Sequence, residues 1–201
     1  MNELDPSDSV PEINGRLIAV FGISGVGKTT LIDRFIRTHR NWQPLSASSL
    51  LVKLTGQDSH ELRALDRQRI ECNQSALIEA VCRQRTAEPG SNWLLDAHSV
   101  IDNGSEWVIV PLQVIAHINL DGLIFVHDDP LKILARRAAD PQRLRPLSSL
   151  KRVEEEQTVA VQTCEMYSTQ LRLRLHRIEA DDFLEFSETI ARTKAGARST
   201  Q

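Results

Sequence analysis

The stretch from Gly22 to Thr29 has the residue types and the spacing of a loop that binds phosphate groups. It fits the pattern G-x-x-x-x-G-K-[ST], and a second threonine follows it. Its glycines can adopt positive φ angles, so successive backbone N–H groups can turn inward around phosphate oxygens. We therefore expect nucleotide phosphates to bind to the following residues: Gly22, Ser24, Gly25, Val26, Gly27, Lys28, Thr29 and Thr30.

Two side chains of this loop have distinct expected tasks. The ammonium group of Lys28 can reach the β and γ phosphates, and the hydroxyl of Thr29 can bind a magnesium ion. The helix that begins at Gly27 adds the positive end of its dipole at the same place. The loop therefore predicts Mg²⁺ as a cofactor.

The elements around the loop decide whether it is more than a glycine-rich turn, which can match the pattern by chance. The apolar run at residues 16–21 predicts a strand before the loop, and helical spacing at 29–39 predicts a helix after it. Strand, loop and helix occur in the order that phosphate binding requires, and this order favours the phosphate-binding interpretation.

Strands and helices continue to alternate along the chain. Further strands are expected at residues 41–45, 92–98, 121–129 and 174–180, and helices at 46–56, 59–85, 130–140, 149–173 and 181–193. Residues 107–120 are ambiguous, and Pro111 favours a loop followed by a short helix. The alternation predicts an α/β fold with a five-stranded, mainly parallel sheet and helices on both faces.

An acid stands at the end of the expected third strand. Asp96 would lie beside the loop, where it could hold Mg²⁺ through water; the alternative is that it caps a turn or helix. The next residues are Ala97 and His98, with no glutamate to activate water, which disfavours a motor ATPase. The usual GTPase motifs for the switch and for base recognition are absent too. His98 either contacts a substrate or has a structural role.

Four arginines within ten residues form a second basic cluster, at Arg136, Arg137, Arg143 and Arg145. They could close over phosphates as a lid of about residues 138–148 and exclude water; the alternative is a solvated basic surface. The acidic run at residues 154–156 is expected to pair with these arginines or to favour a helix dipole, without a part in catalysis.

Composition narrows the range of partners. The 201 residues are 41% hydrophobic and 25% charged with a net charge of −3, which argues against bulk binding to nucleic acid or a membrane surface. We expect one domain at residues 15–192 between flexible tails at 1–14 and 193–201, in the cytoplasm. The three cysteines, Cys72, Cys82 and Cys164, form no paired motif and are expected to be buried free thiols.

At this point the chain resembles the nucleoside monophosphate kinases of the P-loop NTPase superfamily, and within them the archaeal-type adenylate kinases. The resemblance covers about residues 16–175 and rests on "GISGVGKTT", "LLDAHSVI", "ILARRAADPQRLRP" and "VEEEQ". It implies a P-loop kinase fold with a short arginine-bearing lid. It also implies that Lys28 neutralises the transferred phosphoryl group, that Arg137, Arg143 and Arg145 clamp the phosphates, and that Asp96 helps Thr29 to place Mg²⁺.

The resemblance also implies an acceptor site between the helix near residues 46–49 and the start of the long helix. Its expected residues are Ser46, Ser48, Ser49, Arg69 and His98. An arginine typical of the family is missing from "TVAVQT". The function indicated is transfer of a phosphoryl group from the co-substrate ATP to a small-molecule nucleotide, AMP first. The alternatives are a kinase for another small acceptor and a nucleotide-binding regulatory ATPase.

Overall fold

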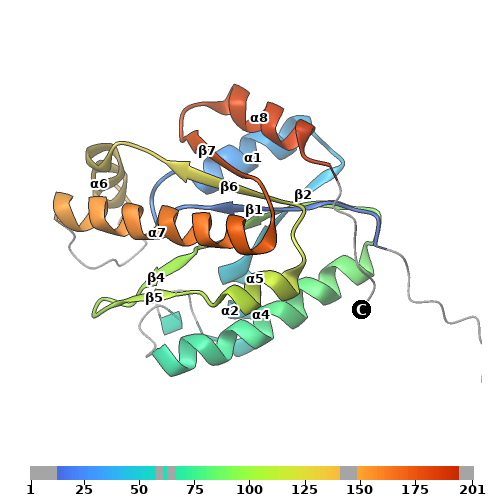
Figure 1. Cartoon of the computed structure of the whole chain (residues 1–201), viewed down its shortest axis with the longest axis horizontal. Coiled ribbons are helices and arrows are strands. Elements are labelled where there is room, and N and C mark those ends of the chain that lie inside the picture. The colour runs from blue at the N-terminus through green and yellow to red at the C-terminus, as the bar shows by residue number, and fades with distance from the viewer. Residues whose placement is uncertain (1–12, 58–60, 63–66, 141–148, 195–201) are drawn as a thin grey trace, which may run out of the picture.

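Five strands form one parallel sheet in the order β2-β3-β1-β6-β7 (Figure 1). The computed structural model describes residues 13–57, 61–62, 67–140 and 149–194. The strands are β1 (Leu17–Phe21), β2 (Trp42–Ser46), β3 (Asn92–Asp96), β6 (Gly122–His127) and β7 (Leu175–Glu179). Their number and direction confirm the predicted α/β fold.

The register of the strands determines which residues meet at the carboxyl edge of the sheet. Val20 on the central strand β1 is paired with Asp96 on β3, and Asp96 is paired with Ser46 on β2. On the other side of β1, Phe21 is paired with Phe125 on β6. Because β1 is followed in the chain by strands on one side and then by strands on the other, its carboxyl end is a topological switch point, where ligands bind in open α/β sheets.

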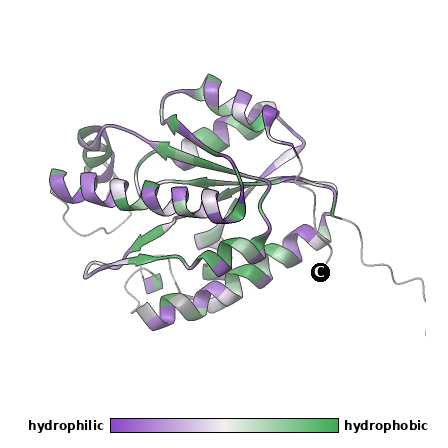
Figure 2. Ribbon diagram, in the orientation of Figure 1, coloured by the Kyte–Doolittle hydropathy of each residue, from purple (hydrophilic) through white to green (hydrophobic). Residues whose placement is uncertain are grey.

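Helices cover both faces of the sheet. Helices α1 (Lys28–Thr38) and α8 (Phe183–Arg192) lie above the sheet in Figure 1, and α4 (Arg67–Ala87) and α5 (Leu112–Ile118) lie below it. Helix α7 (Leu150–Leu171) packs against β6 and α5, while α2 (Ala47–Thr55) contacts α4 and α6 (Pro130–Ala138) contacts α7. The helices turn much of their apolar surface toward the sheet (Figure 2).

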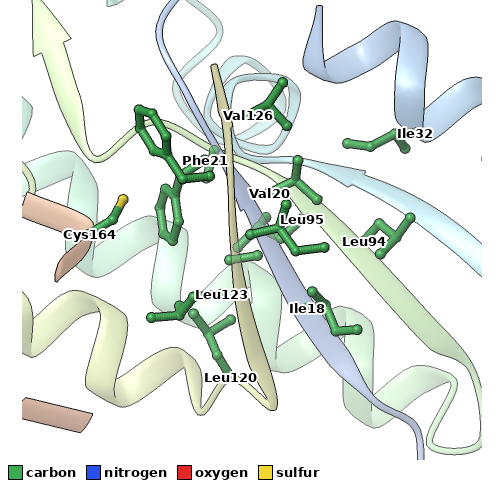
Figure 3. Packing of buried hydrophobic residues seen from close by; sticks show 14 of the residues in the cluster. Ile18, Val20, Phe21, Ile32, Leu94, Leu95, Leu120, Leu123, Val126 and Cys164 are labelled. Atoms are coloured by element: carbon green, nitrogen blue, oxygen red, sulfur yellow. The ribbon is translucent and has the colours of Figure 1, made fainter. Parts of the chain in front are cut away.

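The buried core lies on both faces of β1, all of whose side chains are buried. Phe21 and Cys164 lie on one side of the strand, and Val20 and Ile32 lie on the other (Figure 3). The Phe21 ring is 5.9 Å from the ring of Tyr167 on α7, centroid to centroid. A strand buried on both faces has no polar alternation, which is why its sequence reads as a continuous apolar run.

The edge strand β2 contains a proline. Pro44 is paired in register with Leu94 on β3, and among the described residues β2 has no second neighbouring strand. Proline is found in sheets mainly on edge strands, because it has no N–H group and its nitrogen can face the open side there without the loss of a hydrogen bond between strands. The position of β2 therefore accounts for the proline within it.

Two sequence expectations need correction, and a third is confirmed where the structure describes it. Residues 107–109 form strand β5 (Trp107–Ile109), which pairs antiparallel with β4 (Val100–Asp102), so the loop expected there is wrong, although the short helix after it is confirmed as α5. The long helix expected over 59–85 is confirmed as α4, from Arg67 to Ala87, and part of the expected range before Arg67 lies outside the described residues. Cys72 and Cys82 are exposed, and only Cys164 is buried, where burial raises its thiol pKa to about 12.

Other expectations lie largely outside the described residues. These are the flexible tails and most of the lid, with Arg143 and Arg145 in it, so their structure stays a prediction. Within the described ranges, no helix combines the length and the apolarity that a membrane crossing requires.

A buried arginine ties the amino edge of the sheet to the helices below it. The guanidinium of Arg85 on α4 donates hydrogen bonds to the carbonyl oxygens of Ile118, Asn119 and Gly15 at 3.3, 3.0 and 3.2 Å. It also lies 4.0 Å from the carboxylate of Asp121, which accepts a hydrogen bond from the backbone N–H of Leu17. This one side chain therefore joins α4, α5 and the segments that precede β1 and β6.

We expect Arg85→Met to lower the free energy of unfolding by about 3–5 kcal/mol, because it removes the cation beside a buried carboxylate and the donor to three carbonyl oxygens. The matched control is Arg83→Met on the same helix. Arg83 is 72% exposed and pairs with Glu79, and surface pairs of this kind contribute at most about 1 kcal/mol. Urea unfolding measures both variants, and equal losses would contradict the role given to Arg85.

Candidate active site

The phosphate-binding loop joins β1 to α1 and is shaped by glycines at places where no other residue fits. Gly25 has a φ of +81°, and a Cβ atom there would lie 2.9 Å from Cγ of Arg137. A Cβ atom on Gly22 would lie 2.6 Å from the carbonyl oxygen of Val126. Such contacts are too close, so these glycines let the loop curl tightly between β6 and α6.

Lys28 is the first residue of α1 and is 5% exposed. Its Nζ donates to the carbonyl oxygens of Gly22 at 2.8 Å and Ile23 at 3.3 Å. It also lies 3.3 Å from Nε2 of His98 and 3.7 Å from Oδ1 of Asp96. Because an ammonium group only donates, His98 accepts this hydrogen bond through Nε2, which requires the neutral ring with its proton on Nδ1. The loop, the acid and the histidine thus converge on one cation.

Two side-chain oxygen atoms that could bind a metal ion lie together at the carboxyl end of β3. The hydroxyl of Thr29 donates to Oδ2 of Asp96 at 2.7 Å, a separation that suits two neighbouring oxygens around Mg²⁺. The described residues contain no cluster of three or more potential metal-ligating side chains. Mg²⁺ in phosphate-transfer sites uses one or two protein oxygens and completes its shell with phosphate and water, so Thr29 and Asp96 fit the ion.

A cavity of about 780 Å³ opens over the loop, and we call it the P-loop cavity. Its walls include the loop itself, the amino end of α1, the first turns of α2, and the side chains of Asp96, His98 and Arg136. It lies at the carboxyl edge of the sheet, beside the amino ends of two helices. Backbone N–H groups and the positive ends of helix dipoles there favour anions.

A second cavity, of about 130 Å³, lies below the sheet among α2, α4, α5 and the β4–β5 hairpin, and we call it the apolar cavity. Leucine, isoleucine and valine side chains form most of its wall, and a cavity of about 150 Å³ lined in this way holds one benzene ring. One of its polar residues is Gln74, which is 4% exposed and donates through Nε2 to the carbonyl oxygen of Ile70 at 3.0 Å. That bond fixes the orientation of the amide in the wall.

The two cavities adjoin each other. Ser24, Ser48 and His98 line both of them. Oγ of Ser24 is buried and makes no hydrogen bond to any residue that the structure describes. A buried polar atom without a partner calls for an explanation, and a ligand at this junction would provide one. The junction is also where Nζ of Lys28 approaches His98.

Two consecutive arginines on α6 donate hydrogen bonds to carbonyl oxygens of the phosphate-binding loop. Arg136 donates to the carbonyl oxygen of Val26 at 2.9 Å and forms an ion pair with the buried carboxylate of Asp128. Burial alone would raise the pKa of Asp128, but hydrogen bonds from Arg136 and from the N–H of Asp129, together with the charges of Arg136 and Lys132, hold it below its usual value.

Arg137 also contacts a carbonyl oxygen of the loop and a buried carboxylate. Its Nε donates to the carbonyl oxygen of Ser24 at 2.8 Å, and a terminal nitrogen lies 2.9 Å from the carboxylate of Glu156 on α7. The two side chains are 9% and 4% exposed. Burial raises the pKa of Glu156, and the charge of Arg137 opposes this shift. Glu156 therefore pairs with an arginine, as the sequence suggested for the acidic run.

The structure brings some of the predicted site residues together and separates others. Lys28, Thr29, Asp96 and His98 meet beside the loop, and Arg137 lies against its Ser24 carbonyl. Of the expected acceptor serines, Ser46 and Ser49 line the P-loop cavity, and only Ser48 also reaches the apolar cavity. Ser46 caps α2, accepting from the N–H of Ser49 at 3.2 Å.

Arg69 is exposed near the start of α4 and is not among the described residues that line either cavity. Sequence reasoning missed Gln74. It placed Arg136 only within the expected lid cluster, and it expected Glu156 only to pair with an arginine or to favour a helix dipole. A polar residue on the apolar face of a helix was the available signal for Gln74. For Glu156 the signal was a carboxylate at the same helical face as Val153 and Ala160, which are buried.

Comparisons with known proteins agree with this geometry. A family model described as AAA domain matches residues 21–154. The adenylate kinase of Methanoculleus marisnigri is 25% identical over 154 residues, which cover 71% of this chain and 78% of that protein. The adenylate kinase of Methanococcus vannielii is 24% identical over 152 residues, covering 72% of this chain and 79% of that protein. These matches confirm the predicted resemblance to archaeal-type nucleoside monophosphate kinases.

Among solved structures, the shikimate kinase of Bacteroides thetaiotaomicron matches with a TM-score of 0.55 and 14% sequence identity. The match covers 88% of this chain and 95% of that chain. At this low identity the match shows a shared fold, that of a P-loop kinase.

We expect Lys28→Met to weaken the binding of Mg²⁺-ATP at least about tenfold, or ~1.4 kcal/mol, because the central cation of the loop is lost. The control is Lys53→Met, since Lys53 lines the same cavity but is exposed on α2. An exposed charge interacts weakly, so the control should change affinity less than about threefold. Calorimetric titration measures both, and similar losses would remove Lys28 from its proposed place in the site.

Proposed function

We propose that this chain, which belongs to the AAA domain family, is an ATP-dependent phosphotransferase whose acceptor is a nucleoside monophosphate, AMP first. The observation that carries the proposal is the pair of adjoining cavities, one over the phosphate loop and one apolar, with Ser24, Ser48 and His98 in the wall of both. A kinase needs two substrates that meet at one point, and this arrangement offers a place for each.

The P-loop cavity suits the triphosphate of ATP. Inward N–H groups of the loop and the ammonium of Lys28 would stabilise the negative charge that spreads over the γ-phosphoryl group during transfer. Thr29 and Asp96 would hold Mg²⁺, which, when bound, neutralises charge on the β and γ phosphates. The donor phosphates would then end close to the junction with the second cavity.

The apolar cavity suits the ring of a nucleobase. Its aliphatic walls would stack on a planar aromatic ring, and the carbonyl end of the fixed Gln74 amide could accept a hydrogen bond from an exocyclic amino group. An acceptor bound this way would extend its phosphate toward His98 and Arg137, which also line the cavity. This orientation would bring the acceptor phosphate to the junction.

In the proposed reaction, an oxygen of the acceptor phosphate attacks the γ-phosphorus of ATP. The bond between that phosphorus and the β–γ bridging oxygen breaks, and ADP leaves with the electron pair. With AMP as acceptor, two ADP molecules are formed. The attacking oxygen is already anionic, so no general base is required, and the protein acts by alignment, charge stabilisation and exclusion of water.

A hydroxylated acceptor without a phosphate is the second candidate, and one observation favours it. The apolar cavity has two carboxylates in its wall, from Asp102 and Glu156, and these are paired with Arg152 and Arg137. Paired acids reduce the positive potential that an acceptor phosphate would meet. A regulatory ATPase without an acceptor is less well supported, because hydrolysis needs no second, apolar cavity.

Partners and location follow from the same proposal. The protein would bind small-molecule nucleotides and would need no nucleic acid or membrane. We place it in the cytoplasm, where ATP and nucleoside monophosphates are available.

The proposal predicts that the purified protein, incubated with ATP, Mg²⁺ and single acceptors, converts AMP to ADP faster than it converts GMP, CMP or UMP. Chromatographic separation of the nucleotides measures each product. Rapid diphosphate formation from another member of the panel would keep the mechanism and reassign the base. Phosphorylation of adenosine or another nucleoside alone would support the second candidate, and ATP hydrolysis without transfer would contradict both.

We also expect Asp96→Asn to raise the Mg²⁺ concentration needed for half-maximal rate by about tenfold, because a neutral amide holds the ion less well than a carboxylate. Asp33→Asn is the matched control, since Asp33 lines the same cavity from an exposed position on α1. Rates measured across a Mg²⁺ titration at saturating ATP give both values. An unchanged Mg²⁺ dependence in Asp96→Asn would exclude its role in holding the metal.

A further inference from the structure

The two arginines at the end of α6 are neighbours in sequence but face different cavities. Successive residues of an α-helix are rotated by about 100° around its axis, so Arg136 and Arg137 leave α6 in different directions. Of the described residues, Arg136 lines the P-loop cavity and is not part of the apolar cavity, and for Arg137 the reverse holds. Arg136 therefore faces the cavity proposed for ATP, and Arg137 faces the cavity proposed for the acceptor.

Each arginine has two partners, and these are of the same two kinds for both. One partner is a carbonyl oxygen of the phosphate loop, at Val26 for Arg136 and at Ser24 for Arg137. The other partner is a buried carboxylate from a different element, Asp128 after β6 and Glu156 on α7. The carboxylate side chains are 5% and 4% exposed.

A buried carboxylate does more for an arginine than neutralise its charge. The guanidinium is planar and its donors form a rigid fork, so two acceptors on different sides fix both its position and its plane. Lysine in the same place would be held only as a point charge. The acids thus determine where each guanidinium lies relative to the loop and to its cavity.

We propose that Asp128 and Glu156 are positioning residues that divide the two arginines between the substrates, Arg136 serving the ATP phosphates and Arg137 serving the acceptor phosphate. The division rests on the proposed function, because it names the arginine for each substrate of that reaction. Glu156 acts through Arg137, and Asp128 acts through Arg136. Ser24 lies in both cavities, so Arg137 on its carbonyl stands at the junction where the acceptor phosphate would arrive.

The test compares Glu156→Gln with Asp128→Asn, which keep side-chain size but remove the charge. We expect Glu156→Gln to raise the KM for the acceptor about tenfold while the KM for ATP changes less than about twofold. Asp128→Asn should do the opposite. Glu154→Gln is the matched control for the helix, because Glu154 is an exposed acid on the same turn of α7 and should change neither KM.

A further variant keeps the test decisive if the loss of a buried acid harms folding. Arg137→Lys retains the positive charge and loses the fork, and it should raise the acceptor KM as Glu156→Gln does. Combined, Arg137→Lys and Glu156→Gln should be no worse than Arg137→Lys alone, because the acid acts only through the arginine. A purely structural role of Glu156 would instead lower the unfolding midpoint and leave both KM values alike, which would overturn the assignment.

Direct binding separates this inference from the proposed function. Mg²⁺-ATP titrated into each variant should bind more weakly to Asp128→Asn and unchanged to Glu156→Gln. If the wild-type protein binds ATP but phosphorylates no acceptor, the proposed function fails while this titration still decides the ATP side of the division. Equal weakening of ATP binding by both variants would sink the division whether or not an acceptor is found.

Discussion

A loop that turns its N–H groups inward around phosphates must turn its carbonyl oxygens outward, and in a buried loop each of these oxygens needs a donor. The carbonyls of Gly22 and Ile23 accept from Lys28, that of Ser24 accepts from Arg137, and that of Val26 accepts from Arg136. The cations of the site are thus also the donors that satisfy the backbone. The same side chains that make the loop stable give it its positive charge.

Because these cations both satisfy the backbone and supply the positive charge, acids lie close to a site that binds anions. Buried cations are costly unless they are paired, and the buried Lys28 and Arg137 lie beside Asp96 and Glu156. Asp128 is itself a buried acid, and it pairs with the more exposed Arg136. Asp96 lies in the wall of the P-loop cavity, whereas Asp128 and Glu156 are not among the described residues that line it. Charge is therefore balanced across the site as a whole, while the side facing the P-loop cavity keeps donors for phosphate.

The sequence predicted the loop, the acid after β3 and the five strands because these depend on local patterns: glycine spacing, a continuous apolar run, helical periodicity. It did not predict the β4–β5 hairpin, whose strands are three residues each and are stabilised by pairing with one another. Nor could it predict that Arg136 and Arg137 face different cavities, since the direction of each depends on how α6 is rotated against the loop. Gln74 was missed because α4 is placed over the cavity by tertiary packing alone.

The proline in the edge strand bears on how the protein behaves at high concentration. The carbonyl of Asn41 accepts a hydrogen bond from Asn92 of β3, and since backbone groups alternate along a strand, Pro44 faces the open side of β2. That open edge therefore lacks a donor at its centre, and a strand of another molecule cannot extend the sheet there with regular pairing. The proline thus protects the edge nearest the start of α2 against aggregation by strand addition.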